Sequence, residues 1–278
     1  EHPPHWNVWF VAFSGHWQAL AGSREFVEDI LLSKEVQEGT LKPRMVMNLD
    51  LSSGSNRLSI VRTSHFYRLD ILVPWEDWFM SRLQNYFMDL QIETGMRVSN
   101  FIDVAVQQQG WWARIPTPYM TDSDPMAVAG MVAITFRTSE DSRIFWNTPV
   151  DDLKKVNIEN LAAQLKLIDY IILRFANEAE WGIDWDVVSP QRFFVSGISR
   201  PANSGFVTLK GKVVTYNITK GWYDRVPNAL VTLKSSDNSN YPFSTMIAIA
   251  DEEGNFVIHG LSPIFIRQTS YTIEAWVL

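Results

Sequence analysis

Continuous apolar runs recur along the first two thirds of the chain. They cover residues 6–14, Met45–Asp50, Leu58–Thr63, Phe101–Val106 and Met131–Phe136. Unbroken apolar runs of this length are typical of strands that are covered on both faces, as in a mostly parallel sheet. A short segment of small polar residues, 52–56, joins the second run to the third. We therefore expect five buried strands.

Helical periodicity appears between these runs. Ser23 stands where a helix N-cap is expected, and residues 75–94 carry large apolar side chains at near-helical spacing. Asn157 is a predicted N-cap for a further helix, whose stripe is Leu161, Leu165, Ile168, Ile172 and Phe175. Strands that alternate with helices predict an α/β domain with a doubly wound, mostly parallel sheet.

The pattern changes at Gly205. Short β-like runs such as 229–233 alternate with turn signals such as 226–228 and 251–255, without helical periodicity, which is typical of an all-β sandwich. We expect an α/β domain at residues 1–190, a linker at 191–204 and a β-sandwich at 205–278 that is truncated at its end. The strand-like character of both ends predicts that the chain is a piece of a longer polypeptide.

Composition disfavours or excludes several classes of function and site. The net charge is −7 with scattered basic residues, which disfavours a nucleic-acid groove. No apolar run reaches the roughly 20 residues of a membrane helix. The chain has no cysteine, which excludes disulfides, thiolate zinc sites and a cysteine nucleophile. The triplet Asn217-Ile218-Thr219 is a glycosylation sequon, so Asn217 is a candidate glycan site on an extracellular or cell-surface protein.

Several short sequence segments in residues 6–177 suggest a family. They are the strand and loop at 10–27 with Gly22-Ser23, the strand end Asn48-Leu49-Asp50, the segments 122–125 and 129–134, and Asn147-Thr148-Pro149 before the capped helix. In order and local sequence this region resembles the back two thirds of a di-zinc aminopeptidase or glutamate-carboxypeptidase-like exopeptidase domain. Residues 205–278, through 209–213, 227–231 and 251–261, resemble a transthyretin-like, carboxypeptidase-regulatory-like domain.

The exopeptidase resemblance implies peptide hydrolysis by two zinc ions, which polarise the carbonyl and generate hydroxide. Carried over by position, the general base falls on His16, the next zinc ligand on Trp17, a later ligand on Asp50 and the last ligand on Asn147. Only Asp50 keeps a ligand of the family's type, because an indole offers zinc no lone pair and an amide oxygen suits harder cations. The resemblance therefore implies a degenerate member with a dismantled metal site.

The leading hypothesis is a non-catalytic, peptidase-like module of a larger exported protein, with a binding or structural role, protein partners or self-assembly, and no cofactor. The alternative is an active metallo-aminopeptidase with a rearranged zinc site and a peptide substrate. A third hypothesis is a carbohydrate-binding surface at Trp111-Trp112. From the residues alone, Asp50 could instead cap a turn with Ser52 and Ser53, or join Asp122 and Asp124 in a calcium or magnesium site.

Overall fold

A computed structural model describes residues 3–61, 75–97, 102–103, 120–146, 148–192, 205–235, 245–261 and 271–277. Its helices are α1 (Ala21–Phe26), the π-helical turn η1 (Val27–Leu31), α2 (Lys34–Gln37), α3 (Glu76–Thr94), α4 (Asp124–Val128), the 3₁₀ turn η5 (Leu153–Lys155), α5 (Ile158–Asn177) and α6 (Trp185–Val188). Its strands are β1 (Met45–Asp50), β2 (Leu58–Val61), β3 (Ile102–Asp103), β4 (Val132–Thr138), β5 (Val207–Lys212), β6 (Val214–Asn217), β7 (Trp222–Arg225), β8 (Leu230–Ser235), β9 (Met246–Ile249), β10 (Asn255–Leu261) and β11 (Tyr271–Trp276).

The first part of the chain has a mixed four-stranded sheet, in the order β1-β4-β2-β3. β1 is parallel to β4 and β2 is parallel to β3, but β4 and β2 are antiparallel. The prediction of a doubly wound, mostly parallel sheet of zinc-exopeptidase type is therefore wrong. Residues 51–57, which join β1 to β2, are too few for a helical crossover, which needs a dozen or more residues, so β2 returns in the opposite direction.

The strand expected at residues 6–14 is also absent. These residues have no strand partner in the described structure, and Trp9 and Phe10 are 60% and 92% exposed. The segment is held at its ends instead. Trp6 donates its backbone N–H to Ala176 at the end of α5, and Gly22 donates to Ser14. An apolar run alone thus did not determine strand pairing here.

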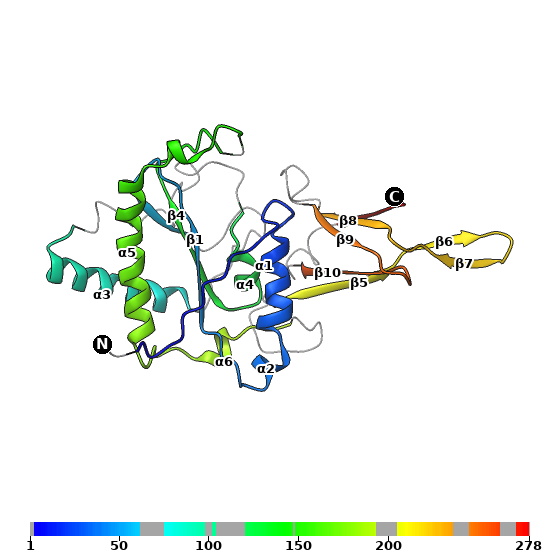
Figure 1. The fold of residues 1–278 in the computed structure, drawn as a ribbon. Coiled ribbons are helices and arrows are strands. Elements are labelled where there is room, and N and C mark those ends of the chain that lie inside the picture. The colour runs from blue at the N-terminus through cyan, green and yellow to red at the C-terminus, as the bar shows by residue number, and fades with distance from the viewer. Residues whose placement is uncertain are drawn as a thin grey trace.

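Helices cover both faces of the sheet (Figure 1). Alternate residues of β4, Val132, Ile134 and Phe136, pack into one apolar cluster with α3 and α5. Ala133 belongs to a second cluster with α1, η1 and α4. The same alternation directs Thr135 and Arg137 of β4 toward the α1 and α4 side, because successive side chains of a strand point to opposite faces.

The helix predicted to start at Asn157 is confirmed. The Asn157 Oδ1 accepts the backbone N–H of Asn160 at 3.1 Å, and α5 follows directly. The Ser23 cap is wrong, because α1 begins at Ala21 with Leu20 at its N-cap, in a left-handed conformation. Among the residues that the structure covers, no helix is long and apolar enough to cross a membrane.

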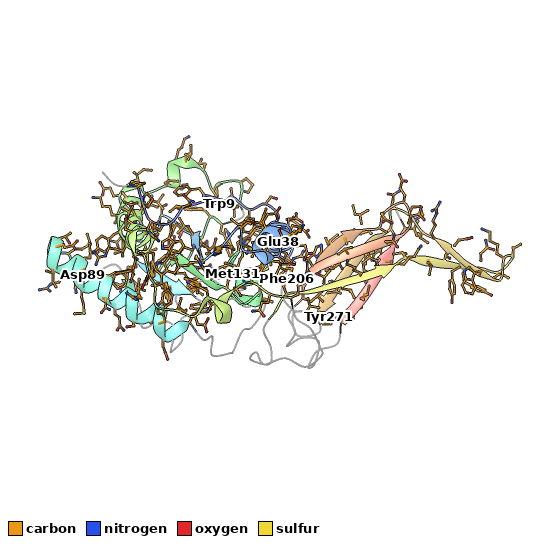
Figure 2. All side chains as sticks on the ribbon, turned by 90° about the horizontal axis from the view of Figure 1, so that it is seen from below. Trp9, Glu38, Asp89, Met131, Phe206 and Tyr271 are labelled. Carbon is orange, nitrogen blue, oxygen red and sulfur yellow. The ribbon has the colours of Figure 1, made fainter. Side chains whose placement is uncertain are left out.

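From β5 onward the described elements are all strands, but they form three small sheets, β10-β5, β11-β8-β9 and the hairpin β6-β7. The second apolar cluster continues into these strands through Phe206, Val231 and Ile258. Figure 2 places Phe206 near Met131, which belongs to the same cluster. The β part and the α/β part therefore share apolar core.

Candidate functional site

Polar residues gather on the α1 and α4 side of the sheet, at the carboxyl ends of the parallel strands β1 and β4. Asn48 and Asp50 of β1 lie opposite Thr135 and Arg137 of β4 in the strand register. In open α/β sheets this edge is the usual place for a ligand site. The sequence predicts that Asp50 stands at the end of a strand, and in the structure Asp50 is the last residue of β1.

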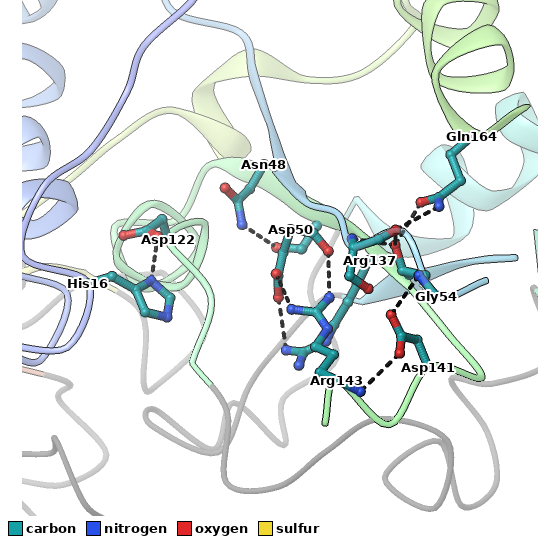
Figure 3. A network of polar contacts seen from close by, with 12 residues as sticks. His16, Asn48, Asp50, Gly54, Asp122, Arg137, Asp141, Arg143 and Gln164 are labelled. Atoms are coloured by element: carbon teal, nitrogen blue, oxygen red, sulfur yellow. Dashed lines mark hydrogen bonds and ion pairs between the residues drawn. The ribbon is translucent and has the colours of Figure 1, made fainter. Parts of the chain in front are cut away.

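Asp50 is held between two arginines. Its Oδ2 lies 3.0 Å from Nη1 of Arg137, and its Oδ1 accepts a hydrogen bond from Nη1 of Arg143 at 2.7 Å. Arg143 also donates Nη2 to the backbone carbonyl of Asp50 at 2.9 Å. The two guanidinium side chains are 1% and 8% exposed. Both carboxylate oxygens of Asp50 are thus committed to buried cations (Figure 3).

Asp141 completes this cluster of charges. Its Oδ2 accepts the backbone N–H of Gly54 at 3.0 Å, and its Oδ1 accepts the backbone N–H of Arg143 at 2.9 Å. Burial raises the pKa of Asp141, but the hydrogen bonds from the backbone N–H groups of Arg143 and Gly54 and the charge of Arg143 help to outweigh burial, so its pKa lies below the ordinary value. Two carboxylates and two guanidinium groups then balance in charge.

The structure does not show Asp50 as a cap of the turn after β1, because its carboxylate contacts Arg137 and Arg143. The turn after β1 is held by other side chains. Gln164 of α5 donates Nε2 to the carbonyls of Ser52 at 2.9 Å and Ser55 at 2.7 Å. Asp50 is thereby left to the arginines, and the turn is tied to α5.

The residues that could carry acid–base chemistry form a separate group. Nδ1 of His16 lies 2.7 Å from Oδ2 of Asp122, and the hydroxyl of Ser23 donates to Oδ1 of Asp122 at 2.9 Å. A carboxylate on one ring nitrogen fixes the orientation of an imidazole. Figure 3 shows this pair apart from the Asp50 cluster, with Asn48 between them in the view. The pairing of His16 with Asp122 was not foreseen, because it joins loops far apart in sequence.

The remaining predicted site residues lie in other surroundings. Trp17 packs edge-on against His16 and at 5.0 Å from the ring of Trp146, beside the second apolar cluster. Asp124 is fully buried and accepts the hydroxyl of Thr121 at 2.7 Å. Asn147 and the pair Trp111-Trp112 lie outside the described residues.

The predicted acidic site of Asp50, Asp122 and Asp124 does not form a ligand set in the covered part of the chain, where no three His, Cys, Asp or Glu side chains lie together as metal ligands. Each of the three carboxylates instead has its own protein partner. The residues around Asp50 also do not fit zinc. At 4 Å and an effective dielectric constant of about 20, each guanidinium would oppose a divalent cation by roughly 8 kcal/mol.

Asn217 ends β6. Its Nδ2 donates to Oδ2 of Asp224 at 2.6 Å, and its Oδ1 accepts the backbone N–H of Lys220 at 3.2 Å. The sequon asparagine thus closes the turn of the hairpin β6-β7, which projects from the rest of the molecule in Figure 1. An exposed hairpin turn is a favourable place for an N-linked glycan.

Comparisons of the chain with protein-family models, with curated proteins and with solved structures give no match. The resemblances to zinc exopeptidases and to transthyretin-like domains therefore rest on the local sequence alone. Arg137, Arg143 and Asp141 are the site residues that the sequence interpretation missed. One signal was available: Arg137 directly follows the apolar run Met131–Phe136, and an arginine buried at the end of a core strand requires a carboxylate partner.

Proposed function

We propose that this chain is a non-catalytic module of a larger exported or cell-surface protein, with a binding or structural role. The observation that supports this proposal most is the pairing of the Asp50 carboxylate with two arginines. The one ligand-type residue that the exopeptidase resemblance retains has both oxygens bound by the guanidinium groups of Arg137 and Arg143. An ion pair of this kind positions strands β1 and β4 and the loop after β4, and it engages both carboxylate oxygens of Asp50.

Trp17 supports the same proposal. The resemblance assigns a zinc ligand to this position, but the indole packs against His16, Trp146 and the apolar cluster beneath. An aromatic side chain that fills this space contributes apolar burial in place of coordination. The proposal therefore assigns these positions to packing and ion pairing.

Peptidase assays test the proposal. The purified chain would be incubated with a panel of amino-acid p-nitroanilides and dipeptides, with added zinc and then with a chelator. We expect no turnover above the buffer rate, and no change on chelation. Zinc-dependent hydrolysis that disappears in Asp50→Ala, with the fold retained by circular dichroism, would overturn the proposal.

The pairing of His16 with Asp122 favours the second candidate, an exopeptidase with a rearranged metal site. A side chain oriented by a carboxylate is the arrangement that a general base requires. This candidate predicts that His16→Ala abolishes turnover while Ser33→Ala, a cap residue of α2 elsewhere on the surface, leaves it unchanged. If no turnover is found in the unaltered chain, the second candidate fails.

Whether the sequon on which the export proposal draws can accept a glycan is tested independently. The chain expressed through a eukaryotic secretory pathway should gain the mass of one glycan, which Asn217→Gln removes. The free energy of unfolding of the same Asn217→Gln chain made in the cytosol should lie within about 1 kcal/mol of that of the unaltered chain, because the hydrogen bonds it loses to Asp224 and Lys220 belong to an exposed turn. A secreted chain with no glycan would remove this support for export.

A further inference from the structure

Two of the small sheets of the β part, β10-β5 and β11-β8-β9, leave a groove between them. β9 and β10 lie side by side, so the sheets approach each other along that edge. On the opposite side, between β5 and β11, a groove of about 420 Å³ is open to solvent. Its lining is mostly apolar and includes Leu209, Gly211, Val231, Phe256, Ile273 and Ala275. Ile273 is 49% exposed although it faces this groove.

Among the described residues, β5 is unpaired along the edge that faces away from β10, beyond the bridge that joins Phe206 to Arg192 just before the strand begins. Val213 donates its backbone N–H to Gly254, on the side of β10. Because alternate residues of a strand direct their N–H and C=O groups to opposite sides, Lys210 and Lys212 direct theirs away from β10. Among the residues that the structure covers, β10 is the one strand that pairs with β5.

An extended peptide is the occupant that matches these features. A two-stranded sheet is marginally stable in water, and β10-β5 has only two strands in the covered part of the chain. A third strand beside β5 would pair with the edge that the described residues leave unpaired, and would direct every second side chain into the apolar groove. Lysines at the edge of a sheet disfavour pairing with uncharged strands, and they favour a strand with acidic residues at the cross-strand positions.

We propose that the groove between β5 and β11 accepts an extended strand from another polypeptide chain. The strand pairs with β5 through the backbone of Lys210 and Lys212. Its alternate residues are apolar and contact Ile273, Ala275 and Phe256, and the residues between them are acidic. This surface lies away from Asp50 and His16, so the inference stands whether or not the molecule is catalytic.

A short synthetic peptide tests the proposal. The probe is fluorescein-labelled, has seven residues that alternate Asp and Val, and is titrated with the full chain by fluorescence anisotropy. A peptide of the same composition with all Val before all Asp is the control. We expect saturable binding, at least about 10-fold weaker for the control peptide, with amide chemical-shift changes at Lys210 and Lys212. Equal binding of both peptides, or none, would overturn the proposal.

Matched variants locate the site. Ala275→Phe fills the groove from an exposed position, and Glu274→Phe places the same ring on the other face of β11. Lys210→Pro removes an N–H at the edge, whereas Lys210→Ala keeps it. We expect Ala275→Phe and Lys210→Pro to weaken binding at least about 10-fold, and the two controls to weaken it less than about threefold.

Two further outcomes would overturn the proposal. If Glu274→Phe weakens binding as much as Ala275→Phe, the peptide does not occupy the groove. If the unaltered chain is a dimer by analytical ultracentrifugation and Ala275→Phe makes it monomeric, a second copy fills the groove in place of a different chain. Unfolding curves of each variant confirm that a loss of binding is not a loss of fold.

Discussion

At the scale of single residues, the Asp50 ion pairs decide what this side of the sheet can do. A carboxylate between two nearly buried guanidinium groups stabilises the fold through its partners, because removal of one member leaves the others buried without compensation. The left-handed backbone of Arg143, with φ of 48°, fits this role. Such a conformation costs about 1–2 kcal/mol, which the contacts with Asp50 and Asp141 offset.

We predict that Asp50→Ala lowers the free energy of unfolding by about 3 kcal/mol, because Arg137 and Arg143 lose a buried partner. Urea unfolding measures this loss. Glu38→Gln, which breaks the exposed pair with Lys34 on α2, is the control and should cost less than about 0.5 kcal/mol. Equal, small effects of the two variants would show that the Asp50 pairs contribute little.

A second prediction concerns Gly54. A Cβ at this position would lie 2.4 Å from the carboxylate of Asp141, so Gly54→Ala must displace that side chain from the backbone N–H groups it accepts. We expect a loss of about 1.5–3 kcal/mol in urea unfolding, the size of a hydrogen bond to a charged group. In the Asp141→Asn background the same substitution should cost less, and an unchanged cost would contradict the account.

The sequence placed Asp50 correctly but not its partners. The position of Asp50 follows from a local pattern, an acid at the end of an apolar run. Its pairing with Arg137 depends on the register of β1 on β4, and its pairing with Arg143 depends on a loop that returns to the strand end. Neither relation is local in sequence, so periodicity could not supply it.

At the scale of elements, local signals succeeded where the stabilising contacts are local. Helix α5 begins after Asn157 because an N-cap and an amphipathic stripe lie within one segment. The prediction of a strand at 6–14 failed because an apolar run does not by itself select a partner: β1 is an edge strand of the described sheet, yet residues 6–14 do not pair with it. The expectation that β2 runs parallel to its neighbours was also wrong for β4. The direction of β2 is set by the short connection 51–57 and by the position of β4 between β1 and β2.

We predict that Asn157→Ala lowers stability by about 1 kcal/mol, the usual contribution of an N-cap side chain. Asn157→Ser keeps a capping oxygen and should cost no more than a few tenths of a kcal/mol. Thermal unfolding followed by far-UV circular dichroism measures both variants. If the two substitutions cost the same, Asn157 does not cap the helix in solution.

At the scale of the whole molecule, the shared apolar cluster joins the two parts of the chain. Phe206, 1% exposed, lies in one cluster with Met131 and Val231. Backbone hydrogen bonds cross the same junction, from Gly205 to Val128 and from Phe206 to Gln191. We predict one cooperative unfolding transition, with coincident curves by tryptophan fluorescence and circular dichroism, and a loss of about 3–5 kcal/mol in Phe206→Ala. Two separated transitions would contradict it.

An ion cluster at this junction predicts a pH effect. Burial raises the pKa of Glu28, but the hydrogen bonds from Arg192 and the charges of His259, Arg192 and Lys210 outweigh it, so the pKa lies below 4.5. A carboxyl group whose pKa is lower in the folded state than in the unfolded state stabilises the fold at pH values above its unfolded-state pKa. This stabilisation is lost as the pH falls through the folded-state pKa. We expect the stability difference between the unaltered chain and Glu28→Gln to shrink below about pH 4.5. A difference that stays constant from pH 6 to pH 3 would contradict this linkage.

The measurement that tests the central claim most directly is the zinc content of the purified, dialysed chain and of Asp50→Ala, by elemental mass spectrometry. If Asp50 is held by Arg137 and Arg143 as a structural anion, the substitution leaves the zinc content unchanged, with no stoichiometric zinc that depends on Asp50. A content of about two zinc ions per chain that falls in Asp50→Ala would contradict the account, because Asp50 would then be a ligand of a two-metal centre.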